Sequence, residues 1–184
     1  MTGASAMGAS PCAPILVVRR SYAISRPMPA AASIRDYRPE DLDTLIELFA
    51  GSVRLIASRD YTAAQIEAWA PAAVNRSRWK ERLERRPTFV AELEGEVAVF
   101  SDLEPDGCID MMFVHCDHQG KGVARALLEH IHLRARRQGL KQLFTEASIT
   151  ARPLFERHGF EVIEAQDAEM RGQTFRNFQM AKAL

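Results

Sequence analysis

The stretch IDMMFVHCDHQGKGVAR, residues 109–125, combines a strand pattern, a glycine-containing turn and the start of a helix. Its first six residues suit a buried strand, and its last residues begin an apolar stripe of helical period. Gly120 and Gly122 lie between the two, where the lack of a Cβ atom lets a ligand approach the backbone closely. The free N–H groups and the positive dipole end of the helix would face that ligand. The pattern therefore predicts a pyrophosphate-binding turn, to which Lys121 and Arg125 add positive charge.

Two common phosphate-binding motifs do not fit this turn. A dinucleotide-binding fingerprint requires G-x-G-x-x-G, and its third glycine would fall at Arg125. A P-loop requires serine or threonine after its lysine, but Lys121 is followed by Gly122. On this stretch alone, a plain helix start without a ligand stays open.

Hydrophobic periodicity on both sides of the turn predicts alternating strands and helices. Strands are expected at residues 33–37, 88–93, 96–103, 109–114, 143–147, 160–165 and 175–181. Helices are expected from Pro39 to about Ile56 and at residues 60–70, 77–85, 120–138 and 150–158. This order predicts an α/β (α+β) fold, with a central mixed, mostly antiparallel twisted sheet and helices on both faces.

Length and charge exclude several classes of protein. The chain has 184 residues, with 24 Lys+Arg against 24 Asp+Glu, so it lacks the basic excess of a general nucleic-acid or membrane-surface binder. No run approaches the roughly 18–20 apolar residues of a membrane helix. We therefore expect neither a nucleic-acid nor a membrane partner.

The first 32 residues differ from the rest, because they contain no acidic residue and are rich in Ala, Ser and Pro. We expect a disordered N-terminal extension followed by one domain at residues 33–184; a transit peptide, or a true start at Met28, stays open. The cysteines Cys12, Cys108 and Cys116 match no metal-ligand spacing. Free thiols of this kind indicate a reducing, cytoplasmic location and no metal site.

Two motifs resemble those of the GNAT acyl-CoA N-acetyltransferases. Gln119-x-x-Gly122-x-Ala124 is similar to the family's Gln/Arg-x-x-Gly-x-Gly/Ala signature, and ARPLFERHGF at residues 151–160 is similar to its A-x-x-(F/L)-(Y/F)-x-x-x-G-F segment. Both stand in the family's order and spacing, and the resemblance covers roughly residues 33–184. Phrases such as QIEAWAP at residues 65–71 resemble the YafP-like branch.

The resemblance implies acetyl-CoA-dependent transfer of an acetyl group to the primary amine of a small molecule by direct attack. Protein or peptide amines as acceptors, and a CoA-binding regulatory module without turnover, remain alternatives. Because family members often pair through edge strands, a homodimer also remains open. Implied cofactor contacts are main-chain atoms of Met112, Phe113 and Val114, and residues Gln119, Gly120, Lys121, Gly122, Val123, Ala124, Arg125, Arg152 and Phe155. A backbone N–H of Phe113 or Val114 corresponds to the family's oxyanion donor.

A base is needed if the acceptor is an ordinary alkylamine, because an amine with a pKa of about 10.4 is neutral in about one molecule in a thousand near pH 7.5. Asp110 is the first candidate, since apolar neighbours on its strand would raise the pKa of its carboxyl group. Glu146, inside an otherwise apolar strand, is the second, and His115 is the third. A solvent-facing position, an ion pair and a capping role are their respective structural alternatives.

Phe155 stands where many family members carry a tyrosine that acts as general acid, and it has no proton to donate. A thiolate leaving group with a pKa of about 8.5 can depart unaided, and Tyr61 is the alternative donor. We expect Phe155 to pack against the cofactor. Tyr61 and Trp69, with Trp79, lie between the first two strands, where the family recognises its acceptor. They are expected to line that site, although a core position is equally compatible with their sequence pattern.

Overall fold

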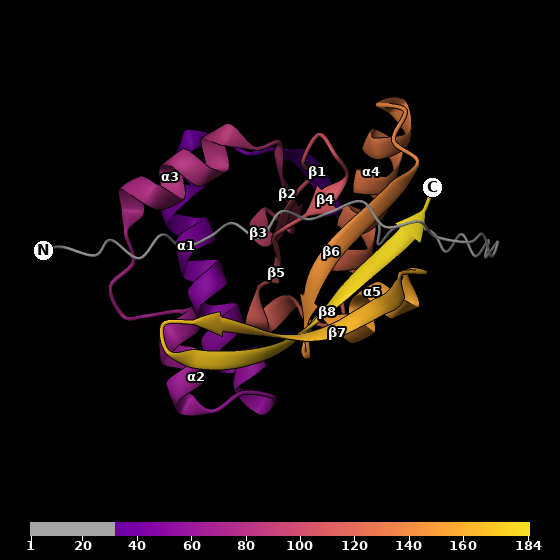
Figure 1. Ribbon diagram of the computed structural model, residues 1–184. Helices are drawn as coiled ribbons and strands as arrows, with labels where there is room; N and C mark the ends of the chain where they lie inside the picture. Colours follow the sequence, from indigo (N-terminus) through magenta and orange to yellow (C-terminus); the bar gives the residue numbers. More distant parts are fainter. Residues whose placement is uncertain (1–31) are drawn as a thin grey trace, which may run out of the picture.

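The computed structural model describes residues 32–184 and arranges their strands in two four-stranded sheets (Figure 1). The first sheet has the order β1 (Ala32–Asp36), β2 (Thr88–Leu93), β3 (Glu96–Asp102), β5 (Met112–Val114), and all its pairs are antiparallel. The second has the order β4 (Cys108–Ile109), β6 (Gln142–Ser148), β8 (Gln173–Ala183), β7 (Glu161–Met170), and only its β4–β6 pair is parallel. The expected mixed, mostly antiparallel α/β fold is confirmed. The extension expected at residues 1–32 lies outside the described residues, except that Ala32 begins β1.

The helices lie on both faces, as expected. Their bounds are α1 (Leu42–Gly51), α2 (Ala63–Trp69), α3 (Arg76–Arg85), α4 (Val123–Arg137) and α5 (Arg152–Arg157). A π-helical turn, Ser52–Ile56, continues α1, and Thr62 caps α2 by accepting a hydrogen bond from the backbone N–H of Gln65. No helix between residues 32 and 184 combines the length and the apolar character needed to cross a membrane.

The strand expected at residues 109–114 is interrupted, and this is where the two sheets separate. The buried carboxylate of Asp102 accepts hydrogen bonds from the backbone N–H groups of Asp110 at 2.9 Å and Met111 at 2.8 Å. Ser101 Oγ donates to the carbonyl oxygen of Met111 at 2.6 Å. These contacts give the backbone groups of Asp110 and Met111 hydrogen-bond partners outside a neighbouring strand. As a result, β4 pairs with β6 whereas β5 pairs with β3.

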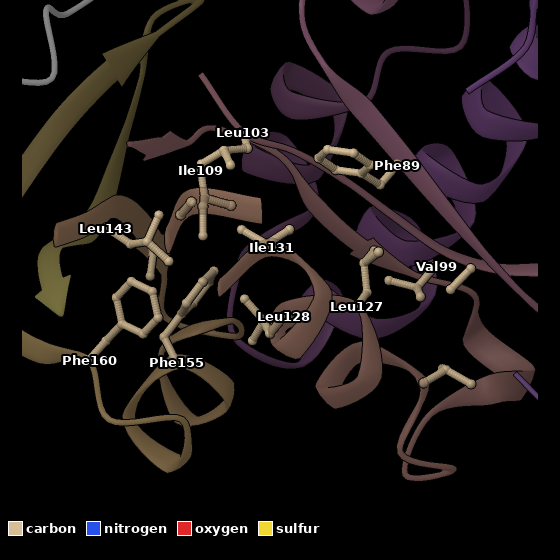
Figure 2. Close-up of a cluster of buried hydrophobic side chains, with 14 of the residues drawn as sticks. Phe89, Val99, Leu103, Ile109, Leu127, Leu128, Ile131, Leu143, Phe155 and Phe160 are labelled. Atoms are coloured by element: carbon tan, nitrogen blue, oxygen red, sulfur yellow. The ribbon is translucent and has the colours of Figure 1, made fainter. Parts of the chain in front are cut away.

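Two hydrophobic clusters hold the helices against the sheets. Leu128 and Ile131 of α4 lie in one cluster with Ile109, Phe155 and Phe160 (Figure 2). The second cluster joins α1 and α3 to the opposite side of the first sheet, and Figure 1 shows these two helices together, away from α4. The core therefore fixes α4 and α5 beside the separation of the sheets.

The C-terminal hairpin is longer than expected, and its tip reaches α2 (Figure 1). Gln65 Nε2 donates a hydrogen bond to the carbonyl oxygen of Thr174 at 2.7 Å, and Arg171 Nη1 donates to that of Ala68 at 2.7 Å. Repeated pairing along β7 and β8 stabilises the extra length. The hairpin thus joins the helical segment before β2 to the end of the chain.

Candidate active site

A cavity of about 1410 Å³ runs from the helical segment before β2, past β5 and the start of α4, to the C-terminal end of the chain. One end is formed by Ser52, Val53, Ile56, Ala57, Trp69 and Phe113, which we call the acceptor end. The middle is formed by Met112, Val114, Gln119, Gly120, Gly122, Val123, Ala124 and Arg125. The other end includes Glu129, His132, Arg136, Arg157, His158, Glu161 and Lys182, which we call the cationic end.

The turn before α4 has the backbone of an anion-binding site. Gly120 and Gly122 have φ angles of 74° and 81°, in the left-handed region that glycine adopts without strain. For this reason α4 begins at Val123 and not at residue 120 as expected. No side chain caps this helix, and its first turn contains no acidic residue. Its N–H groups therefore face the cavity, where the helix dipole favours a diphosphate.

The outer edge of β5 supplies backbone groups beside this turn. The backbone N–H of His115 donates to the carbonyl oxygen of Ala98 at 2.8 Å, and Phe113 is paired with Phe100. Because the direction of hydrogen bonding alternates along an antiparallel strand, Phe113 bonds to β3 while Val114 points to the open edge. Of the two amides that the resemblance left open as oxyanion donor, the register favours Val114.

Three expected cofactor contacts lie away from the cavity wall. Lys121 Nζ lies 3.2 Å from His118 Nδ1, and Arg152 pairs with Glu156 and lies over the ring of Phe178. Phe155 is 2% exposed and packs edge-on against Phe160 (Figure 2).

The helical phase explains the placement of Phe155. Ala151 and Leu154 of the same segment line the cavity, so the next position points into the core. The expected contact between Phe155 and the cofactor is corrected to a role in the core.

The three candidate bases also lie off the cavity wall. Asp110 lies in the interruption between β4 and β5, and its exposed carboxylate pairs with the guanidinium groups of Arg82 and Arg86. Asp110 therefore lies among cations and not among the apolar neighbours that its strand pattern indicated. This placement does not support its role as a base.

Glu146 and His115 are engaged by other groups. Glu146 Oε2 accepts a hydrogen bond from Asn177 Nδ2 at 3.5 Å, and His115 Nδ1 accepts one from the backbone N–H of Asp117 at 3.3 Å. Ligand-type atoms of His115, Cys116 and Asp117 lie within 4.8 Å of one another, but the three residues are consecutive and only partly covered. Neither Glu146 nor His115 is among the residues that line the cavity.

His118 lines the cavity, although neither sequence motif includes it. Its side chain is buried, with Nε2 3.3 Å from Glu96 Oε2 and Nδ1 3.2 Å from Lys121 Nζ. Both ring nitrogens therefore have partners. In the sequence, only its position directly before Gln119 indicated that His118 could lie at the site. That signal did not distinguish it from His115, which belongs to the same short run.

The three expected acceptor-site aromatics have different positions, and Trp79 packs against the second hydrophobic cluster without lining the cavity. Trp69 lines the acceptor end, whereas Tyr61 is 7% exposed and does not reach the cavity wall. The Tyr61 hydroxyl donates to the carbonyl oxygen of Arg176 at 3.1 Å and accepts from the backbone N–H of Ile149 at 2.9 Å. Burial raises the pKa of Tyr61, so its hydroxyl stays protonated. The acceptor contact expected of Tyr61 is corrected to a structural link behind Trp69.

The cationic end contains two histidines that burial keeps neutral. Burial, reinforced by the charge of Lys182, lowers the pKa of His132 to about 3. Burial also lowers the pKa of His158, whose Nδ1 lies 2.7 Å from the carbonyl oxygen of Leu154. The positive charge at this end therefore comes from Arg136, Arg157 and Lys182, whose own pKa burial lowers, and not from the imidazoles.

Replacement of His132 with phenylalanine is expected to reduce the acid sensitivity of the fold. Because the folded pKa of His132 lies below the unfolded value of 6.5, the unfolded chain binds the extra proton, and stability is lost as pH falls from about 6.5 toward 3. His132→Phe preserves the stacking on Phe160 and removes this proton. Urea unfolding at about pH 7 and pH 5 measures the effect, and an equal loss of stability in both proteins would contradict it.

Comparisons with known proteins agree with this architecture. Residues 57–184 match the acetyltransferase (GNAT) domain family. YafP of Escherichia coli K12, described as an uncharacterized N-acetyltransferase, is 39% identical over 148 residues, which cover 80% of this chain and 93% of the relative. The YafP-like resemblance of the sequence is confirmed.

Solved structures show the same fold. A GCN5-related N-acetyltransferase from Rhodopseudomonas palustris matches with a TM-score of 0.81 and 30% identity, over 87% of this chain and 100% of that chain. The PaiA N-acetyltransferase from Thermoplasma acidophilum, solved in complex with coenzyme A, matches with a TM-score of 0.69 and 17% identity, over 84% and 99%. The chain therefore belongs to the GNAT acetyltransferase family, whose members take the acetyl group from acetyl-CoA.

Proposed function

We propose that this protein acetylates the primary amine of a small molecule and binds acetyl-CoA along the whole cavity. The observation that carries the proposal is the uncapped N-terminus of α4 beside the open edge of β5. The pyrophosphate would contact the N–H groups that follow Gly122, and the pantetheine arm would pair with Met112 and Val114. The phosphorylated ribose would then lie toward the cationic end, where Arg136 and Lys182 complement its charge.

The thioester would lie at the Val114 amide, next to the acceptor end. The amine lone pair attacks the carbonyl carbon, the oxyanion accepts a hydrogen bond from the Val114 N–H, and CoA departs as the thiolate, which takes up the proton that the amine loses. The walls of the acceptor end come from the π-helical turn and Trp69, with the hairpin tip packed behind α2. A recess with these walls favours a small molecule over a protein chain as acceptor.

Two features of the described residues support a proposal for the setting of the enzyme. Neither Cys108 nor Cys116 takes part in a disulfide bond, which suits the reducing environment of the cytoplasm. The β7 edge carries the exposed side chains of Val162 and Ile163, which favours pairing of two copies along this strand. We therefore propose a cytoplasmic enzyme that forms a homodimer.

A thermal-shift experiment with acetyl-CoA, free CoA, NAD and ATP, each added alone, tests the cofactor assignment. Mass action predicts about 2.7 kcal/mol of stabilisation at a hundred times Kd, so the midpoint should rise with the two CoA compounds only. The same rise with ATP or NAD would mean that the cavity is a general nucleotide site. An unchanged midpoint with acetyl-CoA would contradict the proposal itself.

A further inference from the structure

The ionisable side chains of the cavity are separated from the place where the amine must react. Among the cavity-lining residues between 32 and 184, every Asp, Glu, Lys and Arg belongs to residues 125–182, and none of them belongs to the acceptor end. Among the described residues that line the cavity, Ser52 and Thr150 carry the side-chain hydroxyls, and Thr150 donates its own to Asp60. The described residues of the acceptor end therefore include no carboxylate that could pair with an ammonium ion and no base that could accept its proton.

The nearest alternatives are already engaged. Asp60 accepts a hydrogen bond from the lining residue Thr150 at 2.7 Å, but Asp60 itself is exposed and does not line the cavity. His118 lines the cavity with both ring nitrogens partnered. Residues 1–31, which the structure does not describe, contain no Asp, Glu, His or Lys, so no carboxylate, imidazole or lysine base can come from them.

An alkylamine meets two obstacles in such a site. Only about one alkylamine molecule in a thousand is neutral near pH 7.5. Among the described residues of the acceptor end, no side chain can accept the proton of the ammonium form. Burial of the ammonium form among apolar side chains without a counter-ion is strongly unfavourable. An amine that is already neutral at pH 7 meets neither obstacle.

Aromatic amines have this property, because the nitrogen lone pair is delocalised into the ring. The acceptor end also suits an aromatic ring: Trp69 lies edge-on to Phe113, with ring centroids 6.4 Å apart, and both residues line the cavity. We infer that the acceptor is an arylamine that attacks the thioester as the free base, without a proton-abstracting side chain. The inference rests on the proposed acetyl transfer and names its substrate class.

The step balances without another reactant. The aniline nitrogen forms a bond to the carbonyl carbon, and the carbonyl π electrons move to the oxygen that faces the Val114 amide. Collapse of this intermediate breaks the carbon–sulfur bond and expels the thiolate. The N–H proton passes through water to the thiolate, which gives an N-aryl acetamide and free CoA.

Two isomeric amines test the inference. 4-Methylaniline and benzylamine have the same formula, but only the first is neutral at pH 7. With acetyl-CoA and the full chain, we expect kcat/KM for 4-methylaniline to exceed that for benzylamine by about a hundredfold at pH 7 and to be constant from about pH 6.5 to 8.5. The value for benzylamine should rise about tenfold per pH unit.

Three results would decide against the inference in different ways. Faster acetylation of benzylamine than of 4-methylaniline at pH 7 would overturn the inference. So would a kcat/KM for benzylamine that stops rising with pH at the pKa of a group on the enzyme, because that group would be a base. Acetylation of neither amine, with the acetyl-CoA thermal shift intact, would overturn the arylamine class alone. Loss of that thermal shift would overturn the proposed function.

A charge placed at the acceptor end gives an independent test. Ser52→Asp supplies the missing carboxylate and is expected to reduce the preference for 4-methylaniline over benzylamine at least about tenfold. Ser77→Asp makes the same chemical change on an exposed position of α3 and should leave the preference unchanged. Trp69→Leu should lower kcat/KM for 4-methylaniline about tenfold while acetyl-CoA affinity is retained. An unchanged preference in Ser52→Asp would contradict the inference.

Discussion

Gly122→Glu is expected to weaken acetyl-CoA binding by at least about a hundredfold, equivalent to about 2.7 kcal/mol. Gly122 has a φ angle of 81° and precedes the free N–H groups of α4. A glutamate there strains the backbone, fills the approach to those amides and places a negative charge where the pyrophosphate would bind. Titration calorimetry with acetyl-CoA measures the loss.

Gly95→Glu is the matched control for this variant. Gly95 also has a positive φ, 85°, and it lies in the turn between β2 and β3 with open space around it. The two variants share the added charge and the backbone strain, which costs about 1–2 kcal/mol. Gly95→Glu should therefore lose similar stability and keep its affinity for acetyl-CoA. Undiminished affinity in Gly122→Glu would exclude the turn before α4 as the pyrophosphate site.

Asp102→Ala is expected to lower the free energy of unfolding by about 3 kcal/mol, because the backbone N–H groups of Asp110 and Met111 lose their acceptor inside the protein. For a domain of this size the thermal midpoint should fall by roughly 10 °C. Since the same two contacts interrupt the strand between β4 and β5, acetyl-CoA affinity should fall as well. Calorimetric melting and ligand titration measure the two effects separately.

Asp102→Asn separates hydrogen bonding from charge. Burial, with a contribution from the charge of Asp110, raises the pKa of Asp102 to about 7, so the folded chain holds a proton that the unfolded chain releases near pH 4. The unfolding free energy of the natural protein therefore falls, from this group, as pH rises from about 4 to 7. Asparagine keeps an acceptor oxygen and has no such titration. It should recover much of the stability that alanine loses and flatten this pH dependence.

Asp110→Asn is the control at the exposed side of the same interruption. The substitution removes solvent-accessible ion pairs with Arg82 and Arg86. The free energy of unfolding should therefore fall by less than about 1 kcal/mol. A loss as large as that of Asp102→Ala would show that the exposed cluster, and not the buried carboxylate, maintains the separation of the sheets.

The fold could be predicted from the sequence largely because its signals are local. The two glycines before α4, the capping pair Thr62 and Gln65, and the strand of residues 88–93 are all recognisable within a few neighbours. The interruption after Ile109 could not be predicted in this way. It depends on Asp102, eight residues from Asp110 along the chain, whose buried carboxylate replaces the ladder partner of the backbone.

The site was predictable to the extent that backbone geometry forms it. Gly120, Gly122 and Val114 line the cavity, and the glycine motif and the strand before it indicate where their main chain lies. Side-chain roles were harder to predict, because they depend on which way a residue points. One helical position separates Leu154 in the cavity wall from Phe155 in the core, and the strand interruption turned Asp110 toward two arginines. The apolar acceptor end comes from segments that no short motif describes.

The links made by Tyr61 also determine when the active site can exist during synthesis. Its hydroxyl contacts Ile149 and Arg176, which lie 88 and 115 residues further along the chain. Contacts of such separation form late, because a long loop must close before they contribute. A nascent chain that ends before Arg176 has its glycine turn but lacks the support behind Trp69. The ribosome must therefore release nearly the whole polypeptide before the enzyme can hold an acceptor.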